Sequence, residues 1–196
     1  MARRSTRDMI LDVAARLFAT KGLRQTTIEA IATEAGRGRR TVYMYFANKA
    51  EIYEAVVQRE IRSIIKPLHD VVSSGDDFET ILYQYAKART DGLYALRQRN
   101  PLLLKDFAQG HSRVEKLRQR LNREEIRILA PFFHNSLDHS HISSEADPED
   151  YAVIFLNMLR GTDRLIVNEN GLKEIRRITS AATGLLLRGI NARKED

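Results

Sequence analysis

The chain has 196 residues, 43% of them hydrophobic, with 32 Lys and Arg against 26 Asp and Glu and no cysteine. Its length and hydrophobic content are enough to bury a substantial core, and the lack of cysteine excludes disulfides and thiolate metal sites. No apolar run approaches the roughly 20 residues of a membrane span, and the opening sequence MARRSTRD lacks the apolar core of a signal peptide. We therefore expect a cytoplasmic protein with no membrane partner.

The excess positive charge is confined to the first quarter of the chain. Residues 1–50 hold ten Lys and Arg against four Asp and Glu, whereas residues 51–196 hold 22 of each sign. Charge concentrated in this way is typical of a surface that binds phosphates.

The basic quarter is predicted to contain three short helices. The first spans residues 5–20, since a Ser-x-x-Asp capping box opens it, one apolar stripe runs along it and a Lys-Gly pair ends it. The second starts at residues 26–29, Thr-Thr-Ile-Glu, which again have capping-box spacing, and it ends at Gly36, where a positive φ is needed. A tight turn and a third helix up to Phe46 complete a predicted helix-turn-helix at residues 27–46.

The third helix has one apolar and one polar side. Val42 and Phe46, four residues apart, are predicted to face the core. We expect the opposite side to enter DNA; it carries Arg40 and Met44, with Thr41 and Tyr43 on its flanks.

The rest of the chain is predicted to be helical too, so the fold class is all-α with about nine helices. A kink or break is expected just before Pro67, because proline removes a hydrogen bond from a helix interior. The expected helices span residues 48–72, 77–99, 102–109, 112–137, 148–168 and 172–192.

A run of motifs in residues 7–57 has the pattern of a known family. The chain reads Tyr-x-Tyr-Phe-x-x-Lys at residues 43–49, directly before a long helix, and this run is preceded by Thr26-Thr27 and Ala35-Gly36. The pattern resembles the TetR family of bacterial transcriptional regulators. Beyond residue 57 only the number and length of the helices are similar.

The resemblance implies a ligand-responsive DNA-binding regulator, a repressor that a small-molecule effector releases from a palindromic operator. Residues 1–47 would form the helix-turn-helix DNA-binding domain, and residues 48–196 a helical ligand-binding and dimerisation domain. The last two helices would join two chains in a homodimer. No cofactor is expected.

The candidate DNA-binding residues fall into groups by the family positions that they occupy. The positions that usually touch the DNA backbone hold Thr27, Tyr43, Tyr45 and Lys49. The positions that usually approach bases hold Arg39, Arg40 and Thr41, and arginine is the usual reader of guanine. Arg37 stands where the family commonly has an apolar residue, and it is a further candidate. The alternatives are a solvated turn for the arginines and core packing for the tyrosines.

Candidate effector-binding residues are found in the second half of the chain. Three charged residues, Arg160, Asp163 and Arg164, interrupt an otherwise apolar helix. They form ion pairs at a contact between helices or a solvated stripe, or one of the arginines anchors an anionic ligand. The aromatic residues proposed to line its pocket, with plain core packing as the alternative, are Tyr83, Phe107, Phe133 and Tyr151. His139 and His141 have a chelating spacing but lack further ligands nearby, so no metal is expected.

Two other classes of function are weighed against the regulator. A non-regulatory architectural DNA binder would share the basic quarter but would show little preference between sequences. An enzyme is not expected, because the sequence offers no nucleophile–base pair, phosphate loop or metal cluster.

Overall fold

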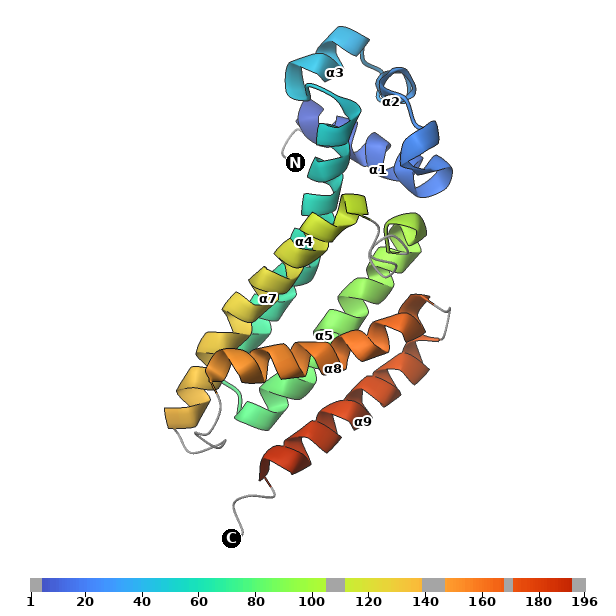
Figure 1. Ribbon diagram of the computed structural model, residues 1–196. Helices are drawn as coiled ribbons and strands as arrows, with labels where there is room; N and C mark the ends of the chain where they lie inside the picture. Colours follow the sequence, from blue (N-terminus) through green and yellow to red (C-terminus); the bar gives the residue numbers. More distant parts are fainter. Residues whose placement is uncertain (1–4, 105–111, 139–146, 168–170, 192–196) are drawn as a thin grey trace.

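The computed structural model describes residues 5–104, 112–138, 147–167 and 171–191, and every element in this part of the chain is a helix (Figure 1). This confirms the all-α fold class. The helices are α1 (Thr6–Gln25), α2 (Ile28–Glu34), α3 (Arg39–Tyr45), α4 (Lys49–Val72), α5 (Phe78–Arg99), α7 (Ser112–Asp138), α8 (Pro148–Val167) and α9 (Leu172–Asn191). Residues 101–104 are helical as well. None of the described helices combines the length and apolar character needed to cross a membrane.

Helices α1–α3 form a head at one end of the molecule, and α4 leads from the head into a body made of α5, α7, α8 and α9 (Figure 1). In the body, α4 packs against α5 and α7, α8 lies across α5 and α7, and α9 packs on α5 and α8. One apolar core runs through both parts, and the edge-to-face rings of Phe18 and Tyr53, 5.4 Å apart, join α1 to α4 within it.

Local side-chain caps explain where the head helices begin. The amide of Asp8 donates to Oγ of Ser5 over 3.1 Å, and the amide of Ala30 donates to Oγ1 of Thr27 over 3.1 Å. These bonds satisfy amides that have no partner inside the helix. The predicted capping box from Thr26 to Glu29 is therefore wrong by one residue: the cap is Thr27, and the hydroxyl of Thr26 is turned inward and donates to the carbonyl of Gly22 over 2.8 Å.

The first helix differs from the prediction at its end. It continues to Gln25 instead of ending at residue 20, but Gly22 interrupts it with a φ of 75°. Only glycine adopts this conformation without a steric cost. The glycine therefore marks a break between two helical stretches, and the second stretch was not foreseen.

Of the kink or break expected before Pro67, the break is wrong, because α4 runs through this residue as a single helix to Val72, and the kink stays a prediction. A proline inside a helix removes one hydrogen bond. Ile64 and Leu68, on either side of it, are buried in the core, and this packing holds the helix together.

Candidate nucleic-acid interface and the helical body

The turn between α2 and α3 is fixed by backbone bonds. Gly36 has a φ of 61°. Its amide donates to the carbonyl of Thr33 over 3.1 Å, and the amide of Arg37 donates to that of Ala32 over 2.9 Å. This pair of bonds is the Schellman motif, which closes a helix on a residue in the left-handed region. Gly38 then caps α3 without a side-chain bond.

The turn presents α3 with its apolar side inward. Val42 and Phe46 are buried, whereas Tyr43, Met44 and Tyr45 are exposed. The predicted facing of this helix is therefore confirmed.

The arginines predicted to bind DNA lie at the exposed start of α3. Arg37, Arg39 and Arg40 are all exposed, and so is Thr27 at the start of α2; Thr41 is half-buried. Two of the arginines have weak local contacts: Nη1 of Arg39 lies 3.8 Å from Oε2 of Glu29, and Nη1 of Arg37 donates to the Gly36 carbonyl over 3.2 Å. Their guanidinium groups remain on the outer surface of the head.

Lys49 has a role in the fold that the sequence did not reveal. Its Nζ donates to the carbonyl oxygens of Leu23 (2.8 Å), Arg24 (3.4 Å) and Thr26 (2.7 Å). An ammonium group has three donors, so all three are directed at the end of α1. The lysine thereby fastens the start of α4 to the head, and its contact with a DNA phosphate stays a prediction.

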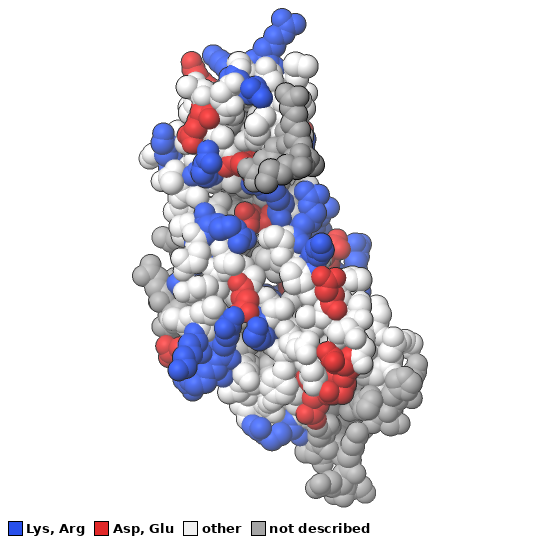
Figure 2. Space-filling model, turned by 180° about the vertical axis from the view of Figure 1, so that it is seen from behind, with Lys and Arg blue, Asp and Glu red and all other residues white. Residues whose placement is uncertain are grey.

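Basic and acidic side chains both occur on the head and on the body (Figure 2). Seen from behind, a basic side chain projects from the tip of the head, and basic and acidic side chains are mixed over the body (Figure 2).

Of the described residues predicted to line an effector pocket, Phe133 and Tyr151 pack together, but only Tyr83 lines the pocket between α5 and α9. Phe133 is buried in the core, where its ring lies 5.9 Å from that of Tyr151. Arg160 is half-buried and its Nη1 donates to Asn157 over 3.1 Å. Phe107, the side chain of Arg164, His139 and His141 lie outside the part of the molecule that the structure describes.

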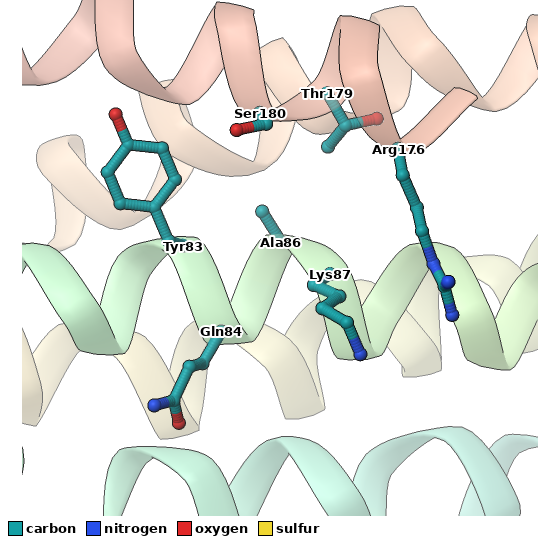
Figure 3. A pocket seen from close by; sticks show the side chains of 7 residues that line it. All are labelled: Tyr83, Gln84, Ala86, Lys87, Arg176, Thr179 and Ser180. Carbon is teal, nitrogen blue, oxygen red and sulfur yellow. The ribbon is translucent and has the colours of Figure 1, made fainter. Parts of the chain in front are cut away.

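Tyr83, the remaining candidate, lines a pocket of about 230 Å³ between α5 and α9 (Figure 3). Its ring extends toward α9, where a Cβ added to Gly184 would lie only 2.7 Å from the tyrosine hydroxyl. The other lining residues are Gln84, Ala86, Lys87, Arg176, Thr179 and Ser180.

One end of this pocket is charged. Arg176 donates from Nε and Nη2 to the carboxylate of Asp91 over 2.6 and 2.7 Å, and Lys87 donates to it over 3.2 Å. Burial raises the pKa of Asp91, but the hydrogen bonds from Arg176 and Lys87 outweigh this effect, and the net pKa is lower than usual. The carboxylate therefore stays ionised at neutral pH.

A second charged group lies inside the body, where sequence reasoning missed two of its three members. Arg89 of α5 donates from Nε to Glu125 of α7 over 2.7 Å, and from Nη1 and Nη2 to Asp163 of α8 over 2.6 and 3.1 Å. The interpretation of Asp163 as part of an ion pair between helices is thus confirmed. The only signal for Arg89 was its place, four residues after Tyr85, on the apolar face of α5.

The surroundings of this triad raise the pKa values of Arg89 and of the neighbouring Tyr85. Burial lowers the pKa of Arg89, but Asp163 and Glu125 raise it more, so the net pKa lies above the usual value. Burial, together with the nearby Glu125, raises the pKa of Tyr85, whose hydroxyl lies 3.4 Å from Glu125 Oε1. The other carboxylate oxygen of Glu125 is buried without a hydrogen-bond partner in the described part of the molecule.

Comparison with known proteins agrees with this architecture. The family model described as "Bacterial regulatory proteins, tetR family" matches residues 10–56. The chain is 33% identical over 76 residues to the HTH-type transcriptional repressor KstR2 of Rhodococcus jostii, an alignment that covers 39% of this chain and 37% of the relative. Alignments with this and the next two curated relatives span only 37 to 57% of the relatives' own lengths.

Solved structures are similar over nearly the whole chain. The fatty acid degradation regulator FadR from Bacillus halodurans has a TM-score of 0.76 at 17% identity, covering 97% of this chain and 98% of its own. The triclosan complex of SmeT, a repressor from Stenotrophomonas maltophilia, has a TM-score of 0.73 at 22% identity, covering 95 and 91%. At these identities the likeness shows a shared fold. Residues 10–56 thus match the TetR family of bacterial regulatory proteins, the curated relatives are HTH-type transcriptional regulators, and the solved structures show the same fold over nearly the whole chain.

Proposed function

We propose that the protein is a ligand-responsive DNA-binding transcriptional regulator of the cytoplasm, a repressor that a small-molecule effector releases from a palindromic operator. The observation that carries this proposal is the outer side of α3. It presents exposed Arg39, Arg40, Tyr43 and Tyr45 on a helix that a Schellman turn and a buried Val42 hold in place. The first turn of α3 carries no acidic residue, so its own side chains do not repel a phosphate backbone, although Glu29 of α2 lies 3.8 Å from Arg39.

In this proposal residues 1–47 read DNA and residues 48–196 bind the effector and the second chain. Arg39, Arg40 and Thr41 approach base edges in the major groove, whereas Thr27, Arg37, Tyr43 and Tyr45 position the head on the phosphates.

Two chains associate through α8 and α9. Ile154 on α8 and Leu185 on α9 are exposed, although both are large and apolar. Small residues, Ala181 and Gly189, lie four positions from Leu185 and allow close approach of a second helix. A two-fold dimer of this kind buries the same surface on both chains.

The effector binds in the body. The pocket between α5 and α9, with Tyr83 at one end, is a candidate site of contact. SmeT, which shares the fold, was solved in complex with triclosan, a small molecule, and this supports a ligand of modest size here. Release from DNA requires the effector to bind the DNA-incompetent arrangement more tightly than the competent one.

The test is selection of double-stranded DNA from a random library by the purified full-length protein. We expect a palindrome with half-sites about one helical turn, or a multiple of it, apart. Its affinity should exceed that for random DNA by about a thousandfold or more. Equal affinity for both would refute a specific regulator and indicate an architectural DNA binder.

Two variants locate the reading surface. Arg40→Ala should relax the base preference at one position of each half-site, because it removes a bidentate donor to guanine. Arg62→Ala, which removes an exposed arginine from α4, is the matched control and should leave the selected sequence unchanged. An Arg40→Ala protein that selects the same palindrome with the same stringency would argue against base reading by α3.

A further inference from the structure

Met44 is the most exposed large apolar side chain among the described residues, at 76%. A single exposed hydrophobic residue is ordinary on a protein surface. Met44, however, follows Tyr43 and precedes Tyr45, which are 47 and 41% exposed, so three successive large side chains at the end of α3 are exposed. Burying these side chains would favour the folded head, yet the fold leaves them in contact with solvent.

The position of Met44 on α3 determines which groups outside the protein its side chain can contact. Val42 and Phe46 take the inward side of α3, which leaves Met44 pointing outward. Arg40 lies four residues earlier, and residues at this spacing share one helix face. The outermost line of α3 therefore consists of a guanidinium group followed by a flexible thioether.

These two groups match different features of the major groove. The oxygen and nitrogen acceptors of guanine suit a guanidinium group. The apolar feature of the groove is the C5-methyl group of thymine, and methionine, being unbranched and polarisable, adapts its shape to apolar contacts.

We propose that Met44 recognises thymine, by packing its thioether end against the C5-methyl group of a thymine next to the base that Arg40 contacts in each half-site. This inference rests on the proposed function and adds a base-specific role for a side chain without a strong hydrogen-bonding group. One buried methyl group is worth about fourfold in affinity, so the two half-sites together should give about 15-fold.

The experiment removes the methyl group and the side chain separately. In the palindrome selected by the wild-type protein, each symmetric pair of thymines is replaced by uracil, which lacks only the C5-methyl group. Affinities of the wild-type and Met44→Ala proteins for both DNAs form a double-mutant cycle. The wild type should lose about 15-fold at one thymine pair, whereas Met44→Ala should bind the thymine and uracil DNAs equally.

Two controls distinguish this contact from a general loss of binding. Arg40→Ala should weaken binding to both DNAs. The ratio of its affinities for thymine and uracil DNA, at the thymine pair that Met44 contacts, should equal that of the wild type. Met44→Gln keeps the length and helix propensity of the side chain. Like Met44→Ala, it should bind the thymine and uracil DNAs with equal affinity. Thermal melting of each variant verifies that the head is folded, and the exposure of Met44 means that its substitution leaves the core intact.

The possible results separate this inference from the proposed function. A thymine-to-uracil ratio that is the same in the wild-type and Met44→Ala proteins at every pair overturns the role of Met44, while selective binding stands. A selected half-site that contains no thymine overturns it as well. If the protein selects no sequence at all, the proposed function fails, and the inference fails with it.

Discussion

Replacing Arg89 by methionine is expected to destabilise the protein strongly. The substitution keeps an unbranched side chain of similar reach but removes the guanidinium group that joins α5, α7 and α8. Its partners, Glu125 and Asp163, would then lose charge-assisted bonds of 2.6 to 3.1 Å. Asp163 is 27% exposed and can turn toward water, but Glu125 is fully buried.

The burial of Glu125 determines how much unfolding free energy the Arg89→Met protein loses. A carboxylate left without its counter-ion in a protein interior costs about 3 to 5 kcal/mol of unfolding free energy. In a chain of this size, each kcal/mol corresponds to about 2 to 4 °C in the melting temperature. The Arg89→Met protein should therefore melt at least about 6 °C below the wild type, at equal protein concentration.

Arg176→Met is the matched control. Arg176 also makes two bonds to a carboxylate, Asp91, but the two side chains are 42 and 28% exposed. An exposed pair is worth about 0 to 1 kcal/mol, because water already solvates both charges. The same chemical change should thus have a small effect at position 176 and a large one at position 89.

The assay is urea unfolding followed by helical circular dichroism, with midpoints compared at equal slope. A further variant, Arg89→Met with Glu125→Met, removes the stranded charge and should recover most of the lost stability. If Arg89→Met cost no more than Arg176→Met, or if the double variant were less stable than the single one, the account of a buried and uncompensated carboxylate would be wrong.

Two further substitutions test contacts outside the triad. Lys49→Met removes the bonds from Nζ to the carbonyl oxygens at the end of α1 and should lower the unfolding free energy by about 2 kcal/mol, measured in urea. Unchanged stability together with a salt dependence of DNA binding flatter by about one unit would instead identify a phosphate contact. Gly184→Ala places a Cβ 2.7 Å from the hydroxyl of Tyr83 and should cost about 1 kcal/mol in thermal melting. Tyr83→Phe removes that hydroxyl and should relieve the cost, and an equal loss in both backgrounds would contradict the steric explanation.

Sequence patterns located the elements of the head because their signals are local. The start of α2 to within one residue, the positive φ at Gly36 and the inward pair Val42 and Phe46 all depend on residues within five positions of each other. Such spacings can be recognised without knowing the tertiary structure. The helix-turn-helix was therefore predicted nearly residue by residue.

The contacts that escaped prediction join distant residues. Lys49 meets carbonyl oxygens 23 to 26 positions away, and Arg89 meets Asp163 across 74 positions. Periodicity places Arg89 on the buried side of α5, but it does not identify the partners that neutralise it. Pro67 was misjudged for a related reason, since the burial of Ile64 and Leu68 overrides the local preference of proline.

Prediction of the effector pocket was limited by another ambiguity. An aromatic residue on the inward face of a helix has the same spacing whether it lines a cavity or fills the core. Phe133 illustrates this, because its ring packs within about 6 Å of Phe78, Tyr151 and Phe155. Only the shape of the folded body separates such residues from Tyr83, which borders an open pocket.

In the proposed regulator, α4 is the helix that runs from the body into the head, and its contacts indicate what carries a signal between them. Two neighbouring residues of α4 make ion pairs in opposite directions: Arg59 with Asp12 of α1 at 2.7 Å, and Glu60 with Arg99 of α5 at 2.8 Å. In each pair at least one partner is a third or more exposed, so the bonds are worth little. The buried rings of Phe18 and Tyr53 pack α1 directly on α4, and close-packed cores shift between discrete arrangements instead of deforming smoothly. A displacement of α4 in the body must therefore move the head as a unit, and core packing, more than the ion pairs, sets how far apart the two reading heads stand.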